Sequence, residues 1–108
     1  MALPHANPAE PVDVRPLGSR LASAQTTTLI KTDTLEVIRL VLPAGKEIAP
    51  HQVRGEVTVQ CLEGRVKLSA SSECELAPGQ LVYLGGSERH ALRASEDSSL
   101  LVTILLAK

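Results

Sequence analysis

From Thr26 onward, the chain consists of short runs of β-forming residues that end at turns rich in glycine and proline. Pro43-Ala44-Gly45, Pro78-Gly79 and Gly85-Gly86 are such turns. No segment repeats its apolar residues with the 3.6-residue period of a helix. The pattern predicts an all-β sandwich or barrel made of about nine or ten short strands.

Nine segments between the turns are expected to form strands. They are residues 26–31, 34–42, 46–50, 56–62, 65–70, 73–76, 81–84, 89–94 and 99–107.

The last of these segments is apolar on both faces. Leu101 and Leu105 lie on one face, and the other carries Leu100, Val102, Ile104 and Leu106. A strand at the surface of a monomer normally alternates apolar with polar residues. A second layer is therefore needed, and either the N-terminal arm or a partner subunit could supply it. We expect a homodimer.

Residues 1–20 differ from the rest because they contain four of the seven prolines, Pro4, Pro8, Pro11 and Pro16. This composition predicts a flexible N-terminal arm over residues 1–20, followed by one domain over residues 21–108. The arm either remains disordered or docks on the domain, where residues 11–14 could add an edge strand. Residues 17–24 could hold a short helical turn.

Composition excludes several classes of function. The net charge is −1 with scattered basic residues, and Tyr83 is the only aromatic side chain, so neither the charge nor the stacking platforms of a nucleic-acid-binding protein are present. The longest apolar run, residues 100–107, is too short to cross a membrane. Two cysteines and an N-terminus unlike a signal peptide make a cytoplasmic protein with reduced thiols the expectation.

Two segments each carry one histidine, His51 or His90, at a defined spacing from flanking glycines. The first is Gly45, five residues, His51-Gln52-Val53, three residues, Val57, six residues and Gly64. The second is Gly79, five residues, Gly85-Gly86-Ser87, two residues, His90, three residues and Ala94. In order and spacing they resemble the two motifs of the cupin family, which are small double-sheet jelly rolls. The first family motif has His-x-His and Glu where this chain has His51, Val53 and Val57, and the second ends in His and Asn.

The resemblance implies an all-β, cupin-like jelly-roll barrel (a double-stranded β-helix) whose metal ligands would fall on His51, Val53, Val57 and His90. Only the two histidines can bind a metal, which would be a divalent ion such as Fe, Zn, Ni or Mn. A third ligand would have to come from Glu56, if a β-bulge re-aimed it, from Cys61 or from the substrate. The other possibility is that no metal is bound.

Alternation along the strands also predicts which side chains face the interior. His51 and Val53 would share one inward face, Val57, Val59 and Cys61 a second, and His90 and Leu92 a third. The predicted ligand-binding residues are His51, Val53, Val57, Val59, Cys61, His90 and Leu92.

A pocket lined by valine and leucine with two histidines is typical of a site for a small, fairly apolar molecule. The resulting hypothesis is a small-molecule-binding protein without strong catalysis. The alternatives are a metalloenzyme of the dioxygenase or isomerase type with a reduced ligand set, and a metal-free enzyme that uses the imidazoles as acid and base. The fold does not choose between them, so catalytic activity stays open and no catalytic residue is assigned.

Overall fold

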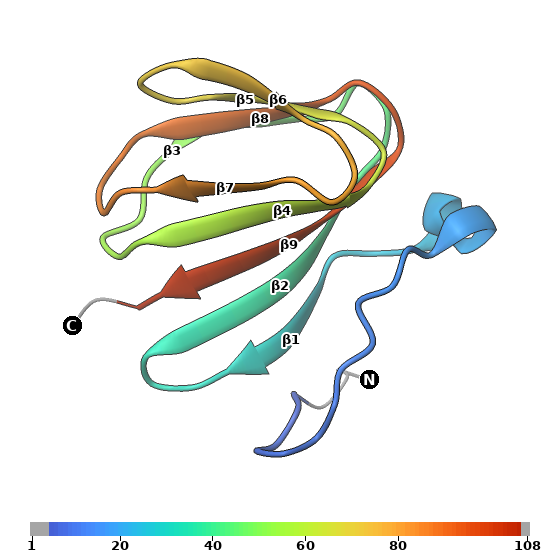
Figure 1. The fold of residues 1–108 in the computed structure, drawn as a ribbon, viewed down its shortest axis with the longest axis vertical. Coiled ribbons are helices and arrows are strands. Elements are labelled where there is room, and N and C mark those ends of the chain that lie inside the picture. The colour runs from blue at the N-terminus through green and yellow to red at the C-terminus, as the bar shows by residue number, and fades with distance from the viewer. Residues whose placement is uncertain (1–4, 107–108) are drawn as a thin grey trace.

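The computed structural model describes residues 5–106, and over this range it contains nine strands and one 3₁₀ helix (Figure 1). Their bounds are η1 (Gly18–Ser23), β1 (Thr27–Lys31), β2 (Leu35–Leu42), β3 (Glu47–His51), β4 (Val57–Glu63), β5 (Val66–Ser69), β6 (Glu73–Leu76), β7 (Leu81–Leu84), β8 (His90–Ala94) and β9 (Ser98–Leu105). Each predicted strand is present, with ends that differ by at most two residues. Position 107, the predicted end of the last strand, lies outside the described residues.

The strands form two antiparallel sheets that face each other as a jelly roll (Figure 1). The first has five strands in the order β1-β2-β9-β4-β7, and the second has four in the order β3-β8-β5-β6. The predicted all-β jelly roll is therefore confirmed. Sequence neighbours are often separated in the sheets, so that the two segments with histidines, around β3 and β8, lie side by side.

The hydrophobic core lies between the sheets. In β4 the buried residues alternate with half-buried ones, and Val57, Val59 and Cys61 all point inward. Alternation places every second residue of a strand on the same face, and β5 and β8 add Val66, Leu68 and other aliphatic side chains to the same core. This layer is what gives the short strands a stable packed arrangement.

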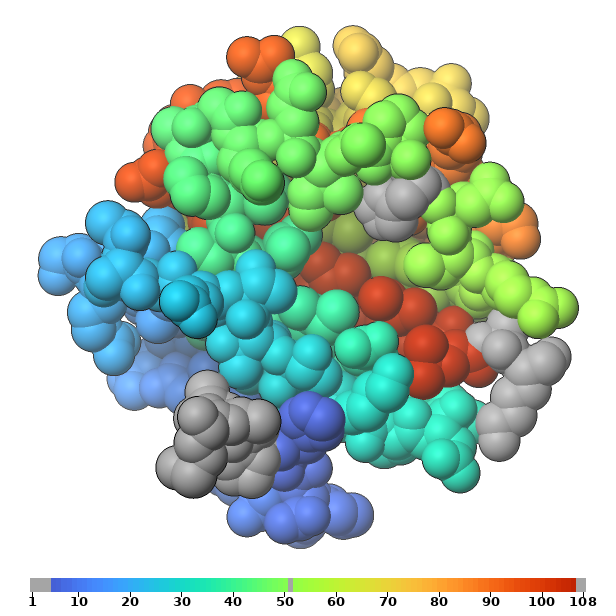
Figure 2. Space-filling view, turned by 180° about the vertical axis from the view of Figure 1, so that it is seen from behind, coloured from blue at the N-terminus to red at the C-terminus, as the bar shows by residue number. Residues whose placement is uncertain are grey.

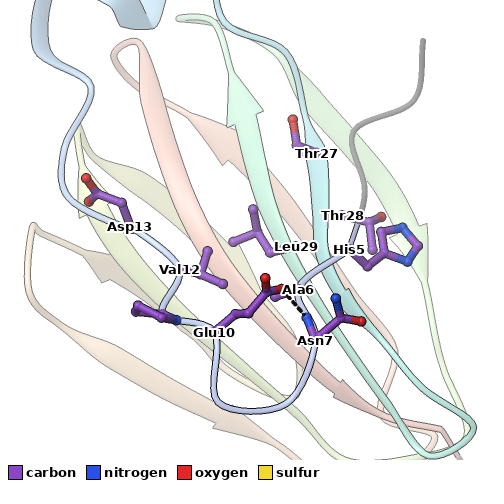
Figure 3. A pocket seen from close by; sticks show the side chains of 10 residues that line it. His5, Ala6, Asn7, Glu10, Val12, Asp13, Thr27, Thr28 and Leu29 are labelled. Atoms are coloured by element: carbon purple, nitrogen blue, oxygen red, sulfur yellow. Dashed lines mark hydrogen bonds between the residues drawn. The ribbon is translucent and has the colours of Figure 1, made fainter.

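The arm, as far as it is described from residue 5, runs along the edge strand β1. The Ala6 backbone N–H donates to the Leu29 carbonyl oxygen at 2.9 Å, and Val12 and Leu29 face a groove of about 590 Å³ between the arm and β1 (Figure 3). Residues 11–14 form no strand, so the expected edge strand is wrong, whereas the expected helical turn is η1. The flexibility of residues 1–20 and the boundary at residue 21 stay predictions.

A buried ionic contact, which we call the arm latch, holds the arm against the outer face of the five-stranded sheet. The Arg39 guanidinium donates to the Arg15 carbonyl oxygen at 2.9 Å, and the Glu63 carboxylate accepts the N–H groups of Leu17 at 2.9 Å and Gly18 at 3.0 Å. Arg39 Nη1 lies 3.9 Å from Glu63 Oε2. The two charges and the backbone of the arm therefore satisfy one another.

Within residues 5–106, no helix is long and apolar enough to cross a membrane.

Candidate functional site

A cavity of about 160 Å³ lies between the two sheets. Figure 2 shows a hollow between β2 (teal) and β3 (green), with β9 (red) at its base. The lining residues are Ile38, Leu40, Ile48, Val59, His90, Leu92, Val102 and Ile104. Seven of these eight side chains are aliphatic, so the lining formed by the described side chains is apolar apart from one imidazole.

Strand alternation explains this lining. Ile38 and Leu40 are alternate residues of β2, and Val102 and Ile104 are alternate residues of β9. The register pairs Val102 directly with both Ile38 and Val59. Directly opposed residues of a sheet present their side chains on the same face. The central strands of the five-stranded sheet thus form one aliphatic wall.

His90 is the polar member of the lining. It is only 5% exposed, and its Nδ1 lies 3.1 Å from the Glu88 carbonyl oxygen. Because a carbonyl oxygen can only accept a hydrogen bond, the proton of the neutral ring belongs on Nδ1, and Nε2 is then the basic nitrogen. This contact orients the ring at the wall of the cavity.

The turn before β8 is fixed by the side chain of Glu88. This carboxylate accepts hydrogen bonds from the backbone N–H of Gly85 at 3.0 Å and from the Ser71 hydroxyl at 2.9 Å. These bonds, the one from Gly85 first, lower the pKa of Glu88 below its usual value. A turn secured in this way gives the imidazole of His90 a fixed backbone support.

His51 and His90 are cross-strand partners in the backbone register of β3 and β8. The ladder between these strands is irregular from Ile48 to His51. The side chain of His51 is not among the described ones, so the predicted role of this imidazole stays a prediction. At the level of the backbone, the two predicted histidine positions do come together.

The predicted pocket residues divide into two groups. Val59 and Leu92 line the cavity beside His90. Val57 is buried in the core and Val53 is half-buried against it, but neither is among the lining residues. The loop that carries Val53 is tied to the turn before β8, because the Ser87 N–H donates to the Val53 carbonyl oxygen at 2.8 Å.

The two candidate third ligands lie away from the cavity lining. Cys61 is fully buried in the core and its thiol donates to the Glu63 carbonyl oxygen at 3.5 Å. Burial raises the pKa of this thiol. Glu56 is exposed and accepts a hydrogen bond from the Tyr83 hydroxyl at 2.7 Å. That contact raises the pKa of Tyr83, a residue that is neither in the core nor in the cavity.

The donor set does not fit the metal centre that the motif spacing implies. A catalytic zinc site commonly has three protein ligands, and a facial iron site has two histidines and a carboxylate. Val53 and Val57 have no donor atom. Among the described residues, no three His, Cys, Asp or Glu side chains are grouped closely enough to hold a metal ion.

Five lining residues were missed by the sequence analysis, namely Ile38, Leu40, Ile48, Val102 and Ile104. A signal for some of them was present, because the last strand already placed Val102 and Ile104 on one face. Strand alternation does not show how far along a strand the cavity extends. It tells which residues point inward, but not which of those meet a cavity and which meet other side chains.

Solved structures resemble this architecture over most of the chain. A conserved protein of unknown function from Streptococcus pyogenes aligns with a TM-score of 0.76 and 23% identity, covering 100% of this chain and 99% of the other. A cupin superfamily protein from Desulfitobacterium hafniense aligns with a TM-score of 0.75 and 14% identity, covering 89% and 94%. An RmlC-like cupin protein from Desulfovibrio desulfuricans gives 0.74 and 20%, covering 89% and 96%.

The chain has the cupin fold. His51 and His90 lie on β3 and β8 of this fold, the strands that correspond to the predicted segments 46–50 and 89–94. At these low sequence identities, the structural similarity shows the fold but not the function. No family model and no curated protein matches the sequence, so the function has to be argued from the cavity itself.

Proposed function

We propose that this cupin binds a small, mainly apolar molecule in the cavity between its sheets, with His90 as the polar anchor. The observation that carries the proposal is the lining, in which aliphatic side chains from both sheets surround a buried imidazole. Ligand sites typically combine an apolar wall with a few fixed polar groups. The hydrogen bond from Nδ1 to the Glu88 carbonyl oxygen supports a fixed orientation of the anchor.

The volume of the cavity limits the size of the ligand. A closed apolar cavity of roughly 150 Å³ is large enough for benzene, so about 160 Å³ fits a molecule of about six to eight non-hydrogen atoms. The aliphatic wall disfavours a charged or multiply hydroxylated compound, because each unpaired polar group would lose its hydration. A compact ring or short branched chain with one hydrogen-bonding group suits this lining best.

The metalloenzyme alternative has less support because two of the four implied ligand positions are valine. Elemental analysis of protein purified without an affinity tag tests this alternative. Near-stoichiometric iron, zinc, nickel or manganese that is lost in a His51→Ala variant would establish it in place of the proposal.

Phenol and toluene are suitable probes because they have similar size and differ in one hydroxyl group. We expect calorimetry or NMR titration to detect saturable binding of both, with phenol binding more tightly. Loss of one hydrogen bond to a buried partner costs about 1–3 kcal/mol, which corresponds to about a 5- to 150-fold difference in Kd between the two probes.

His90→Ala should bring the two affinities together, whereas His5→Ala is the matched control because His5 lies in the arm, outside this cavity. The control should keep the wild-type preference. Absence of saturable binding by either probe, or a phenol preference that persists in His90→Ala, would contradict the proposal. Conversion of a bound probe would favour the acid–base enzyme instead.

A further inference from the structure

A second cavity, of about 490 Å³, lies beside the arm latch. Its lining residues are Asp13, Arg15, Pro16, Leu17, Arg20 and Arg39. The cavity is therefore formed between the arm and β2 of the five-stranded sheet, and it shares no lining residue with the apolar cavity that contains His90. Its volume falls within the range of about 300–1,000 Å³ that is common for ligand sites. Half of its lining residues are arginines.

The charges around this cavity leave one positive charge unbalanced. Three guanidinium groups line it, and two carboxylates lie nearby, those of Asp13 and of Glu63 in the latch. Both oxygens of Asp13 accept hydrogen bonds from Arg15, the shortest at 2.6 Å, and Glu63 lies 3.9 Å from Arg39. Within residues 5–106, no ion pair or hydrogen bond engages the guanidinium of Arg20. This exposed arginine carries the surplus charge.

Arg39 gives the cavity a fixed positive charge at its buried wall. Its side chain is only 8% exposed, and its Nη2 donates to the carbonyl oxygens of Arg15 at 2.9 Å and of Asp13 at 3.4 Å. Arg39 lines the cavity but its partner Glu63 does not, so the positive member of the pair is the nearer one. Salt screens a buried charge less than an exposed one. Arg39 therefore attracts anions into the cavity although its donors are already engaged.

The remaining donors suit a phosphate group. Arg20 offers all of its N–H groups, and Arg15 gives its Nε and Nη2 to Asp13, which leaves Nη1. Guanidinium groups bind carboxylate and phosphate through parallel hydrogen bonds. A flat carboxylate presents both oxygens to one guanidinium, whereas a tetrahedral phosphate presents oxygens in several directions and can contact two. We infer that this cavity binds a small molecule through a phosphate group, which Arg15 and Arg20 contact and the charge of Arg39 attracts.

Inorganic phosphate is the first probe. An NMR titration at about pH 7.5, where a phosphate group carries nearly two negative charges, measures its Kd at constant ionic strength. We expect saturable binding, and weaker binding of acetate under the same conditions. Arg20→Gln should weaken phosphate binding by about 10-fold or more, because it removes charge-assisted hydrogen bonds. Arg20→Lys should give an intermediate Kd, since lysine keeps the charge but lacks the planar guanidinium.

Arg89→Gln is the matched control because it removes the same charge elsewhere. Arg89 is exposed and has no ion-pair partner within residues 5–106, but it precedes β8 of the other sheet and lies outside this cavity. The control should keep the wild-type Kd. Equal weakening in Arg20→Gln and Arg89→Gln would overturn the inference, because phosphate would then respond to the net charge alone. Acetate binding as tight as phosphate binding, or no saturation by about 20 mM phosphate, would also overturn it.

The same titration locates the bound phosphate without any variant. Amide signals of residues 13–20 and of Arg39 should shift, and shifts confined to another part of the chain would overturn the inference. Glycerol phosphate, as a second probe, distinguishes the two sources of a phosphate group. Tighter binding than that of inorganic phosphate would support an esterified ligand that also contacts Pro16 and Leu17, and equal binding would support free phosphate.

Discussion

His51 and His90 occupy directly opposed backbone positions on β3 and β8, although the ladder between these strands is irregular just before His51. The fold therefore keeps the two histidine positions of a cupin metal site together. The other two positions are Val53, half-buried, and Val57, buried in the core. Val53 and Val57 have no donor atom, so restoring donor atoms at these two positions tests whether the four positions form one site.

Val53→His combined with Val57→Glu should create a metal site. Without metal, the buried carboxylate should destabilise the fold by about 3 kcal/mol, because a buried charge has lost its hydration. Binding of Zn²⁺ or Ni²⁺ to the native state should reverse that loss, since a ligand of the folded state stabilises it by mass action. Calorimetry should detect metal affinity at least about 10-fold higher than in the wild type, and Tm should rise when metal is added.

The control for this pair is Val53→His with Val66→Glu, which buries a carboxylate on β5, beside Ala94 at the far end of β8 from His90. It should lose stability without recovering it on metal addition. Equal metal responses in the two double variants would mean that positions 51, 53, 57 and 90 do not converge on one site.

Gly64, which closes the first motif, has a positive φ and close neighbours. Gly79 has a similar φ without such neighbours, so comparing the two separates the effect of backbone conformation from that of steric contact. The φ of Gly64 is +85°, and a Cβ there would collide with the Asp97 carbonyl oxygen and with Ser98. Gly79 has a similar φ of +90°, but a Cβ at this position would have no other atom within 4 Å. Gly79→Ala should cost about 1–2 kcal/mol from the left-handed backbone alone. Gly64→Ala should cost more than about 3 kcal/mol, because steric overlap is added to the backbone strain.

Urea unfolding of both variants measures the difference between the two sites. Similar losses for Gly64→Ala and Gly79→Ala would mean that the turn after β4 can move away from Asp97 and Ser98. In that case Gly64 would serve only the conformation of its own turn.

The strands could be predicted because their signals are local. Alternating apolar residues and Gly/Pro turns lie within a few positions of one another, and β6 and β7 begin and end at the predicted residues. The inward direction of Val59, His90 and Leu92 follows from the same alternation. The fold and part of the cavity are therefore accessible from neighbouring residues in the sequence.

The arm latch could not be predicted in this way. It joins Arg39 to a backbone carbonyl of Arg15, and Glu63 to the backbone N–H groups of Leu17 and Gly18. Backbone groups are present at almost every position, so the sequence does not single out those that accept or donate. Only the three-dimensional path of the arm brings them to the two charges.

Arg39→Ala should release the arm from the sheet. Removing one member of a buried charge pair leaves the other without compensation, so we expect a loss of about 2–4 kcal/mol in unfolding free energy. Trypsin should also cleave after Arg20 more rapidly than in the wild type, because the arm would no longer be held. Mass spectrometry of a short digest identifies this cleavage site.

Arg93→Ala is the matched control for the latch. Arg93 pairs with Glu47 at 3.1 Å, but both side chains are largely exposed, and exposed ion pairs contribute little to stability. Its unfolding midpoint and its rate of cleavage after Arg20 should stay close to those of the wild type. Slow cleavage after Arg20 in the Arg39→Ala variant would mean that the contacts of residues 5–12 with β1 hold the arm without the latch.

Glu63 should make the stability of the fold depend on pH in the acid range. Burial opposes its ionisation, but hydrogen bonds from the Leu17 N–H, the Ser99 hydroxyl and the Gly18 N–H, together with the charge of Arg39, lower its pKa below the usual value. The unfolded chain therefore binds a proton at a higher pH than the native state does. The stabilisation is complete above the unfolded pKa and is lost as the pH falls through the lower, native value.

Urea unfolding midpoints between about pH 3 and pH 6 should decline toward low pH, with a smaller slope in Glu63→Gln. Ser99→Ala keeps the carboxylate and removes one of its donors, so its slope should lie between the two. An unchanged slope in Glu63→Gln would assign the acid sensitivity to other carboxylates and leave the latch with a steric role only.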